Sequence, residues 1–431
     1  SPKMAEIKAF KGMRYTDSGG SLNTLVCPPY DIISDAQRES YIKKNPYNII
    51  RLELPKGGDE RYREAGDTLD KWLDGEILAC DGEDGVYVYE MQFTANGAKR
   101  SLKGFVSLVR LTDFSEGIVL PHEETLSKAK QDRFDLMGET FCNFSQIYSL
   151  YMDEDNSVYG IIDGSSNGAP DMEVTDGDGT VHRMWRISDK NTISRLTAAF
   201  VDKKLYIADG HHRYETALNF HRSLCASGKA VPGDRSGYVM MMLVNMENNG
   251  LVVFPTHRIV HGLAEFNAEK IIDECKKYFT VSEVPDEGRM QAALNMAYDE
   301  GKKAFAMYVG AGNCFVMTLK DETAVKRLLP DMSDAYCGLD VSVLHSLVLE
   351  RIFGIDKENM ANQKNLGYTR SREEALKAVD IDGADCSFIL NPTKVSEIRD
   401  VAAAGEKMPQ KSTYFYPKLI TGLVMNRFGE R

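Results

Sequence analysis

The alternation of apolar and polar positions predicts both helices and strands in the first part of the chain. Residues 34–44 and 61–73 have helical spacing, and the first of these helices would begin at a serine, a residue type that commonly caps a helix. Two segments at 85–94 and 100–111 alternate in strand fashion on either side of Asn96-Gly97, the strongest short signal for a hairpin turn. Together these patterns predict a mixture of helices and antiparallel strands.

The centre of the chain predicts short buried strands followed by one long helix. Apolar runs at 143–152, 204–208, 238–244 and 251–254 have the length of strands, and a turn at 176–182 lies inside a further hairpin. After residue 208, a set of positions recurs three and four residues apart, as on one face of a helix. This set consists of Tyr214, Ala217, Leu218, His221, Leu224 and Cys225.

From about residue 263 the pattern changes to an alternation of helices and strands. The final part of the chain ends in a polar loop that begins at Met408. The predicted helices are 268–279, 287–300 and 340–353, and the predicted strands are 303–310, 313–319 and 387–390.

Composition narrows the classes of protein that this pattern permits. The chain has 431 residues, of which 43% are apolar and 27% charged, so each of two or three domains can bury a core. It carries 52 basic and 64 acidic residues, a net charge of −12, which argues against nucleic-acid binding through phosphate contacts. A local basic pocket for a small anion stays possible, because net charge is a sum over the whole surface.

Neither a membrane span nor a metal-binding cysteine motif is expected. No apolar run approaches the roughly 18–20 residues that a spanning helix needs, and the N-terminus has no signal-peptide pattern. The eight cysteines are scattered and form no C-x-x-C pair, so structural zinc is not expected. The sequence therefore predicts a cytoplasmic protein with reduced thiols.

The most informative segment is the predicted strand, glycine turn and helix around Asp209-Gly210-His211-His212-Arg213. Such a turn directs free backbone N–H groups and the positive end of the helix dipole toward a ligand. Cations in the first turn of a helix are unfavourable unless an anion binds there, so the segment predicts a phosphate site with Arg213 as a bidentate partner. The alternative is two structural histidines and an arginine paired with Glu215 or a distant acid.

The segment Ala-Asp-Gly-His-His-Arg-Tyr-Glu-Thr-Ala resembles the nucleotide-binding signature of the ParB/sulfiredoxin superfamily. The resemblance is greatest to the free serine kinases of that superfamily. It implies that residues 209–213 bind the phosphates of ATP or ADP. His211 stands where sulfiredoxins have their cysteine, which argues against reduction of sulfinic acids.

The whole chain also resembles a bacterial and archaeal family catalogued as a domain of unknown function, number one-thousand-and-fifteen. The resemblance rests on motifs along the whole chain. These motifs are Pro-Pro-Tyr-Asp, Tyr-Asn-Ile-Ile-Arg-Leu-Glu, Leu-Pro-His-Glu, Asp-Gly-His-His-Arg, Pro-Thr-His-Arg and Pro-Gln-Lys-Ser-Thr-Tyr-Phe-Tyr-Pro-Lys.

A second candidate pair follows the short apolar strand that ends at Pro121. The resemblance to serine kinases implies that Glu123 deprotonates the attacking hydroxyl and that His122 orients the substrate or the phosphoryl group. His212 would assist in catalysis. Because Glu123 stands 86 positions before Asp209, residues 144–203 are expected to form an insertion. The alternative for His-Glu is an ordinary helix N-terminus with a capped histidine.

Further candidates follow strand ends or stand in the terminal loop. Thr256, His257 and Arg258 come after a buried strand and would bind substrate, although a rim salt bridge explains Arg258 equally well. In the terminal loop, Lys411 is the candidate for phosphate binding, but the Gly-rich run of a P-loop is missing. Lower-ranked residues are Asp31, Arg51 and Glu53, and His345 on an apolar helical face is expected to be a core histidine.

The favoured hypothesis is a phosphotransferase that uses ATP or ADP with Mg²⁺ near Asp209. Its acceptor would be the hydroxyl of free L-serine or, in reverse, phosphoserine would give its phosphate to ADP; both expectations follow from the resemblance. One alternative is a ParB-like binding protein controlled by nucleotide. The other is a metal-dependent hydrolase that uses His122, Glu123, His211 and His257.

The expected fold class is α+β. A central ParB/sulfiredoxin-like nucleotide-binding and catalytic region at 111–262 would be elaborated by an N-terminal region at 1–110 and a C-terminal α/β region at 263–431.

Overall fold

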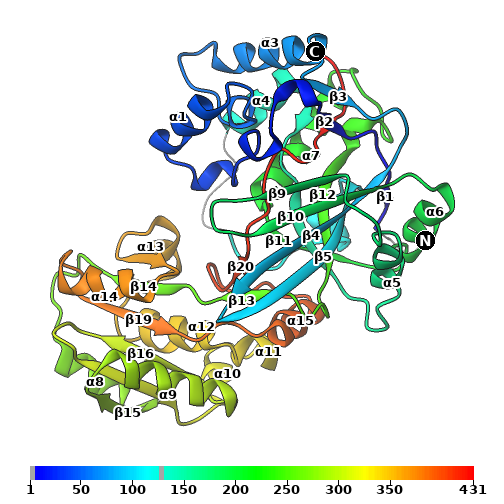
Figure 1. Ribbon diagram of the computed structural model, residues 1–431. Helices are drawn as coiled ribbons and strands as arrows, with labels where there is room; N and C mark the ends of the chain where they lie inside the picture. Colours follow the sequence, from blue (N-terminus) through cyan, green and yellow to red (C-terminus); the bar gives the residue numbers. More distant parts are fainter. Residues whose placement is uncertain (1–4, 126–130) are drawn as a thin grey trace. The chain divides into compact units, whose positions relative to one another are not determined.

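The computed structural model describes residues 5–125 and 131–431, which form two compact units (Figure 1). Among these residues, the first unit comprises 5–121, 131–252 and 417–431, and the second comprises 122–125 and 253–416. Both units mix helices with strands, so the predicted α+β class is confirmed.

A mixed sheet forms the centre of the first unit, and it has nine strands within the described residues. The strand order is β6-β11-β8-β12-β5-β4-β10-β9, and β1 also pairs with β5. The β6–β11 and β8–β12 pairs are parallel and the other pairs are antiparallel. The strands are β1 (Ile7–Lys8), β4 (Val86–Ala95), β5 (Ala98–Arg110), β6 (Val119–Pro121), β8 (Ile147–Tyr151), β9 (Met172–Thr175), β10 (Val181–Ile187), β11 (Leu205–Asp209) and β12 (Tyr238–Asn245).

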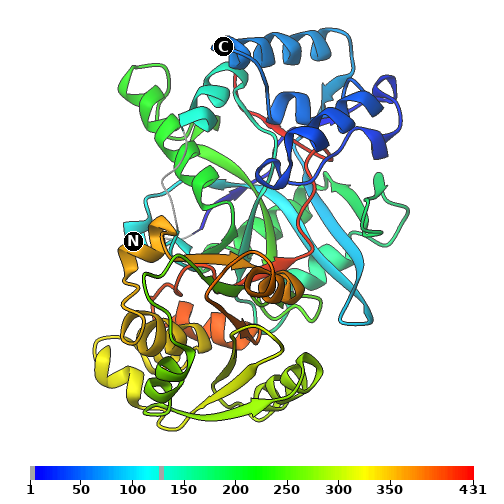
Figure 2. The same cartoon turned by 90° about the vertical axis from the view of Figure 1, so that its left-hand side faces the viewer.

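The hairpin predicted around Asn96-Gly97 is the long β4–β5 hairpin, drawn in cyan in Figures 1 and 2. Both turn residues have positive φ, 52° and 74°, as the Asn-Gly signal requires. The segment 144–203 is not an insertion, because β8 lies between β11 and β12 in the middle of the sheet and β10 pairs with β4. Strands from the predicted regions 1–110 and 111–262 thus share one sheet.

Three helices bury apolar residues in the core of this sheet. They are α5 (Ser157–Gly164), α6 (Lys190–Ala199) and α7 (His211–Ala226). Tyr214 and Ala217 of α7 are buried there together with Ile162 of α5 and Leu196 of α6. The helical face predicted for α7 is therefore the face that fixes this helix on the sheet.

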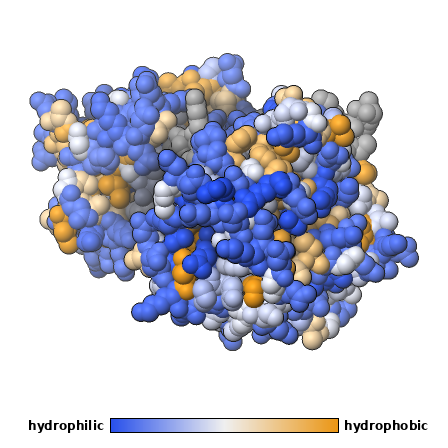
Figure 3. Space-filling view, turned by 90° about the horizontal axis from the view of Figure 1, so that it is seen from above, coloured by the Kyte–Doolittle hydropathy of each residue, from blue (hydrophilic) through white to orange (hydrophobic). Residues whose placement is uncertain are grey.

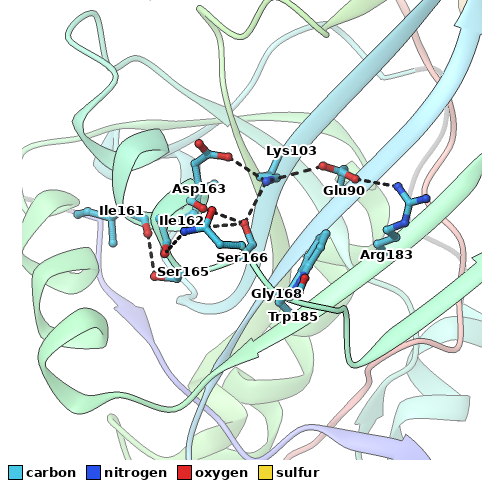
Figure 4. Close-up of polar contacts among 12 residues, drawn as sticks. Glu90, Lys103, Ile161, Ile162, Asp163, Ser165, Ser166, Gly168, Arg183 and Trp185 are labelled. Atoms are coloured by element: carbon cyan, nitrogen blue, oxygen red, sulfur yellow. Dashed lines mark hydrogen bonds and ion pairs between the residues drawn. The ribbon is translucent and has the colours of Figure 1, made fainter.

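A buried lysine ties α5 to the sheet (Figure 4). Lys103 Nζ on β5 donates to Asp163 Oδ1 at 2.9 Å and to Ser166 Oγ at 3.0 Å. It also lies 3.7 Å from Glu90 Oε2 and 5.4 Å from the centre of the Trp185 ring. With these partners the lysine charge is neutralised, and the network is structural.

A second, smaller core in the first unit joins the N-terminal helices to the chain terminus. Trp72, Leu69 and Ile50 are buried in it. In both ribbon views the C-terminus lies beside α3 (Figures 1 and 2). The elements are α1 (Asp35–Lys44), α2 (Ile50–Glu53), α3 (Arg61–Asp74), α4 (Gln131–Thr140), β2 (Met13–Tyr15), β3 (Leu78–Cys80), β7 (Cys142–Asn143) and β21 (Asn426–Arg427).

The second unit is built on an antiparallel sheet of six strands within the described residues, in the order β15-β17-β16-β19-β14-β18. Helices α9 and α14 pack their apolar residues on this sheet. The six strands are β14 (His257–Val260), β15 (Phe279–Val284), β16 (Ala304–Tyr308), β17 (Cys314–Leu319), β18 (Leu366–Thr369) and β19 (Cys386–Leu390). Outside this sheet, β13 (Val252–Phe254) pairs with β20 (Tyr414–Tyr416). The helices are α8 (Ala268–Cys275), α9 (Glu287–Asp299), α10 (Ala324–Leu328), α11 (Asp334–Cys337), α12 (Asp340–Val343), α13 (Lys357–Asn362), α14 (Arg372–Asp380) and α15 (Val395–Ala403).

The apolar helix predicted at 340–353 differs from an ordinary α-helix. It begins as α12 and continues as a π-helix over Leu344–Glu350. π-Helical turns are rare and are frequently found at functional sites. Here the widened helix carries His345, which is buried.

The surface offers no broad apolar area on the face seen in Figure 3, which is mainly hydrophilic with small separate apolar spots. No helix within the described ranges is long and apolar enough to cross a membrane.

Candidate functional site

The strand, glycine turn and helix predicted at the centre of the chain are confirmed. β11 ends at Asp209, Gly210 has a φ of 100°, and α7 begins at His211. The backbone angle requires glycine, and a Cβ atom on residue 210 would lie 2.9 Å from Arg213 Nη2, so that the guanidinium would have to move. The first backbone N–H groups of this 16-residue helix therefore lie at the turn, where they have no partner within the helix.

Lys418 supplies a cation to the turn that sequence reasoning missed. Its Nζ lies 3.4 Å from Asp209 Oδ2. Burial alone would raise the pKa of Asp209, but the charges of Lys418, Arg213 and His211 hold that pKa below its ordinary value. Lys411, the lysine predicted to bind phosphate, belongs to the second unit.

Arg213 keeps most of its hydrogen-bonding capacity. Within the part of the chain that the structure describes, it makes one hydrogen bond, from Nη1 to the Gln146 carbonyl at 2.8 Å. An arginine has five N–H donors, so the remaining ones are available to a ligand. The alternative pairing with Glu215 is not formed, because Glu215 Oε2 lies beside His212 Nδ1, at 3.6 Å.

Arg213 also lines a half-open cavity of about 40 Å³ in the first unit. The walls come from α2, α4, the segment around β7 and β8, α7 and β12. The lining residues are Glu53, Arg133, Leu136, Met137, Cys142, Asn143, Phe144, Ser145, Ile147, Arg213, Thr216 and Val239.

A buried ion pair forms one side of this cavity. Arg133 Nη1 donates to Glu53 Oε1 at 2.9 Å, and both side chains are 7% exposed. Ser145 Oγ donates to the other oxygen of Glu53. The Arg133 guanidinium lies 3.9 Å from the centre of the Tyr30 ring. Glu53, which the sequence ranked low, is therefore part of the same cavity as Arg213.

The environment of Tyr30 reflects this cluster of charges. Burial raises the pKa of its hydroxyl, and the positive charges of Arg133 and Arg213 act in the opposite direction. The Pro-Pro-Tyr-Asp motif of the N-terminus thus contributes to the surroundings of the cavity.

A second group of candidate residues lies in the second unit, where His122 and Glu123 meet the terminal loop. His122 Nε2 hydrogen-bonds Thr413 Oγ1 at 2.6 Å and lies 3.3 Å from Glu123 Oε2. The same carboxylate oxygen accepts from the Ser412 N–H and from Thr413 Oγ1, both at 3.2 Å. The backbone of Glu123 also pairs with Met408. These contacts hold the carboxylate of Glu123 in a defined orientation.

Arg258 is a clamp on the terminal loop, in the sense that it holds the loop through hydrogen bonds to the backbone of Gln410 and Lys411. It is fully buried and donates to the carbonyls of Thr256, Gln410 and Lys411. Its Nε and Nη2 contact His345 Nε2 at 3.3 and 3.2 Å, which occupies the remaining donors. Burial lowers the pKa of Arg258 to about 10. All five N–H groups are thus engaged by carbonyls and an imidazole, and no rim salt bridge of Arg258 is formed among the described residues. The contact of Arg258 with substrate stays a prediction.

The two residues before Arg258 also have internal partners. His257 Nδ1 accepts a hydrogen bond from the Leu390 N–H at 3.1 Å. Burial, with a smaller effect of Arg258 and Arg372, lowers the pKa of His257 to about 4. Thr256 is buried, and its carbonyl accepts a hydrogen bond from Arg258 Nη1. Their predicted role toward a substrate stays a prediction.

The structure brings the predicted residues together in two groups. Residues 209–213 lie in the first unit, and His122, Glu123, the segment 256–258 and Lys411 lie in the second. The assignment of Glu123 as the base that serves residues 209–213 stays a prediction.

The metal-hydrolase alternative finds no preformed ligand set. Within residues 5–125 and 131–431, no three His, Cys, Asp or Glu side chains are grouped closely enough to hold a metal ion. Asp209 is a single carboxylate, which fits Mg²⁺ only where phosphate oxygens supply further ligands.

One known protein family matches most of the chain. Residues 7–342 match the family described as "protein of unknown function (DUF1015)". The chain therefore belongs to this family, as its motifs predict. No curated protein matches the chain.

Several solved structures are similar to this chain at low identity. A conserved hypothetical protein from Pyrococcus furiosus is 14% identical over 71% of this chain and 93% of that chain, with a TM-score of 0.33. A free serine kinase variant in complex with ADP is 14% identical over 71% of this chain and 90% of its own, with a TM-score of 0.34. A C-terminally truncated SbnI from Staphylococcus aureus is 12% identical over 75% and 87%, also with a TM-score of 0.34. At these values the similarity carries no argument about activity.

Proposed function

We propose that the protein is a phosphotransferase that binds the phosphates of ATP or ADP at residues 209–213 and acts on a small hydroxyl compound. The observation that carries the proposal is the Gly210 turn at the start of α7, where Arg213 has donors to spare. A helix N-terminus with an uncommitted arginine is suited to a compact polyphosphate.

The residues of the turn would have separate roles. The first N–H groups of α7 and the Arg213 guanidinium would hold phosphate oxygens, and Lys418, 3.4 Å from Asp209, would neutralise charge. His211 and His212 would lie at the phosphoryl group and assist its transfer. Asp209 would hold Mg²⁺ together with phosphate oxygens. When bound, Mg²⁺ would offset the negative charge of the phosphates.

Glu123 is the proposed base and His122 its positioning partner. The contacts with Ser412 and Thr413 orient its carboxylate, as a general base requires. Free L-serine, or phosphoserine in the reverse direction with ADP, is the proposed partner compound because of the resemblance to serine kinases. Thr256, His257 and Lys411 are secondary candidates for contact with substrate or phosphate.

The direct test is incubation of the protein with Mg²⁺, ATP or ADP and a panel of amino acids, with phosphorus NMR to detect O-phosphoserine. Arg213→Ala should weaken nucleotide binding at least tenfold, the loss expected when charged hydrogen bonds disappear. The control is Arg222→Ala on the same helix, whose side chain is 53% exposed and pairs with Asp113. This control should leave nucleotide binding unchanged.

Two results would separate the alternatives. Nucleotide binding without transfer to any hydroxyl compound would favour the ParB-like binding protein. Absence of any phosphorylated product, together with unchanged nucleotide affinity in Arg213→Ala, would refute the phosphotransferase.

A further inference from the structure

We propose that the half-open cavity behind Arg213 is the binding site for a small zwitterionic amino acid, held between Arg213 and Glu53. This inference rests on the proposed function, because it assigns the place where the acceptor binds. The carboxylate of the ligand would face Arg213 and the hydroxyl of Thr216, and its ammonium group would face Glu53.

The size of the cavity sets the size of the ligand. Its volume of about 40 Å³ has room for roughly three water molecules. A nucleotide cannot fit in this space. Because the cavity is half-open, the carboxylate and ammonium ends of a small amino acid could enter it while its side chain lies at the opening.

Thr216 marks the wall where the carboxylate would lie. Its side chain is 3% exposed, and its hydroxyl has no hydrogen-bond partner among the described residues. Buried hydroxyl groups are normally satisfied, so an unpaired one that lines a cavity is available to hydrogen-bond a molecule bound there. Thr216 lies three residues after Arg213 on α7, which places both on the same face of the helix.

The charges around the cavity match a zwitterion. Glu53 and Arg133 neutralise each other, and Arg213, which forms no ion pair within the described residues, is the cation that a carboxylate in the cavity would face. Glu53 accepts one hydrogen bond on each oxygen, from Arg133 and from Ser145. A carboxylate offers about four acceptor positions, so Glu53 can still accept from an ammonium group.

Arg213 would serve both ligands. One donor is used by the Gln146 carbonyl, and its guanidinium lies over Gly210 on one side and lines the cavity on the other. The remaining donors are enough for one phosphate and one carboxylate oxygen pair. The arginine would therefore place the amino acid next to the nucleotide phosphates.

Thr216→Val is the decisive variant because it removes only the hydroxyl. Without ligand it should be at least as stable as the unmodified protein, since the lost hydroxyl has no partner. We expect its affinity for L-serine to fall about tenfold, and Thr216→Ser should restore it. The control is Thr140→Val, a buried helical threonine whose hydroxyl donates to the Leu136 carbonyl. This control should leave the affinity unchanged.

Calorimetric titrations of the full chain, with and without Mg²⁺–ADP, measure the effect. L-serine should bind, whereas ethanolamine, which lacks the carboxylate, and 3-hydroxypropionate, which lacks the ammonium group, should bind at least tenfold more weakly. Equal affinity of all three compounds, unchanged affinity in Thr216→Val, or no binding of any amino acid would overturn the cavity assignment.

Titration with Mg²⁺–ADP alone separates this proposal from the function itself. ADP affinity that falls in Arg213→Ala, together with an amino-acid affinity that is unchanged in Thr216→Val, would refute the cavity assignment and leave the phosphotransferase in place. If ADP binds to neither the unmodified protein nor its variants, the proposed function fails, and the cavity assignment fails with it.

Discussion

Replacing Arg258 by methionine tests whether this residue is a clamp or a substrate ligand. The substitution leaves four acceptors without a donor. The Thr256 carbonyl and the Nε2 atom of His345 are buried, and the carbonyls of Gln410 and Lys411 are half-buried. At about 2 kcal/mol for each buried group and about 1 kcal/mol for each half-buried one, the loss is about 6 kcal/mol. Removing the buried charge, whose cost is reflected in a pKa lowered from 12.5 to about 10, returns about 3 kcal/mol. The net loss of stability is therefore about 3 kcal/mol.

The loss should be concentrated in the second unit and its terminal loop. Hydrogen exchange of the Met408 amide, which donates to the His122 carbonyl at 2.9 Å, reports the opening of that loop. Arg258→Lys should recover part of the protection, since an ammonium group has three donors. Arg289→Met, at a side chain 73% exposed in the same unit, should change stability by less than about 0.5 kcal/mol. Normal protection and stability in Arg258→Met, with a raised KM for the acceptor, would show that Arg258 binds substrate.

Three further changes have defined outcomes. Lys418→Met should raise the pKa of Asp209, because the positive charge that offsets the effect of burial becomes smaller. A carboxyl NMR titration that shows no rise in this pKa would contradict the prediction. Gly210→Ala should weaken ADP binding about tenfold or more, because its Cβ would displace Arg213. The control is Gly138→Ala on α4, whose Cβ would lie 3.7 Å from Phe220 and which should leave ADP binding unchanged. Equal ADP affinities of the two variants would exclude the steric argument. The pKa of His257 is lowered from 6.5 to about 4, so the unfolded chain takes up a proton at a higher pH than the folded protein. The free energy of unfolding should therefore fall by about 2 kcal/mol between pH 7 and pH 5. His257→Asn should reduce this dependence on pH in denaturant titrations, and an unchanged slope would mean that His257 is not buried in its neutral form.

Local signals predicted much of the secondary structure. The helix at 35–44 begins with a complete capping box between Ser34 and Gln37, and the Asn96-Gly97 hairpin forms where expected. These features depend on neighbouring residues, so a single sequence contains the information. The π-helix after Val343 has no such local signal, and its residue His345 contacts Arg258, which is 87 positions away in the sequence.

The candidate site was predictable in part for the same reason. The Gly210 turn combines a strand end, a glycine and a helix start within a few residues. Lys418 and Glu53 join this unit from distant segments, and the ion pair between Lys418 and Asp209 spans 209 positions. A lysine in the tail could be proposed from its motif, but which of Lys411 and Lys418 meets the turn depends on where the chain returns to the first unit.

Two arginines that follow strand ends looked alike in the sequence and differ in the number of donors they have left. Arg258 is surrounded by acceptors of its own unit, so an added anion would have to displace bonds already formed within the protein. Arg213 makes a single hydrogen bond in the described part of the chain and adjoins an unpaired hydroxyl on Thr216. The free energy that an arginine contributes to ligand binding comes from donors that water satisfies before the ligand arrives. Because only Arg213 of the two has such donors, an anionic ligand should bind at the turn of the first unit, and Arg258 should influence activity only through the loop that it holds.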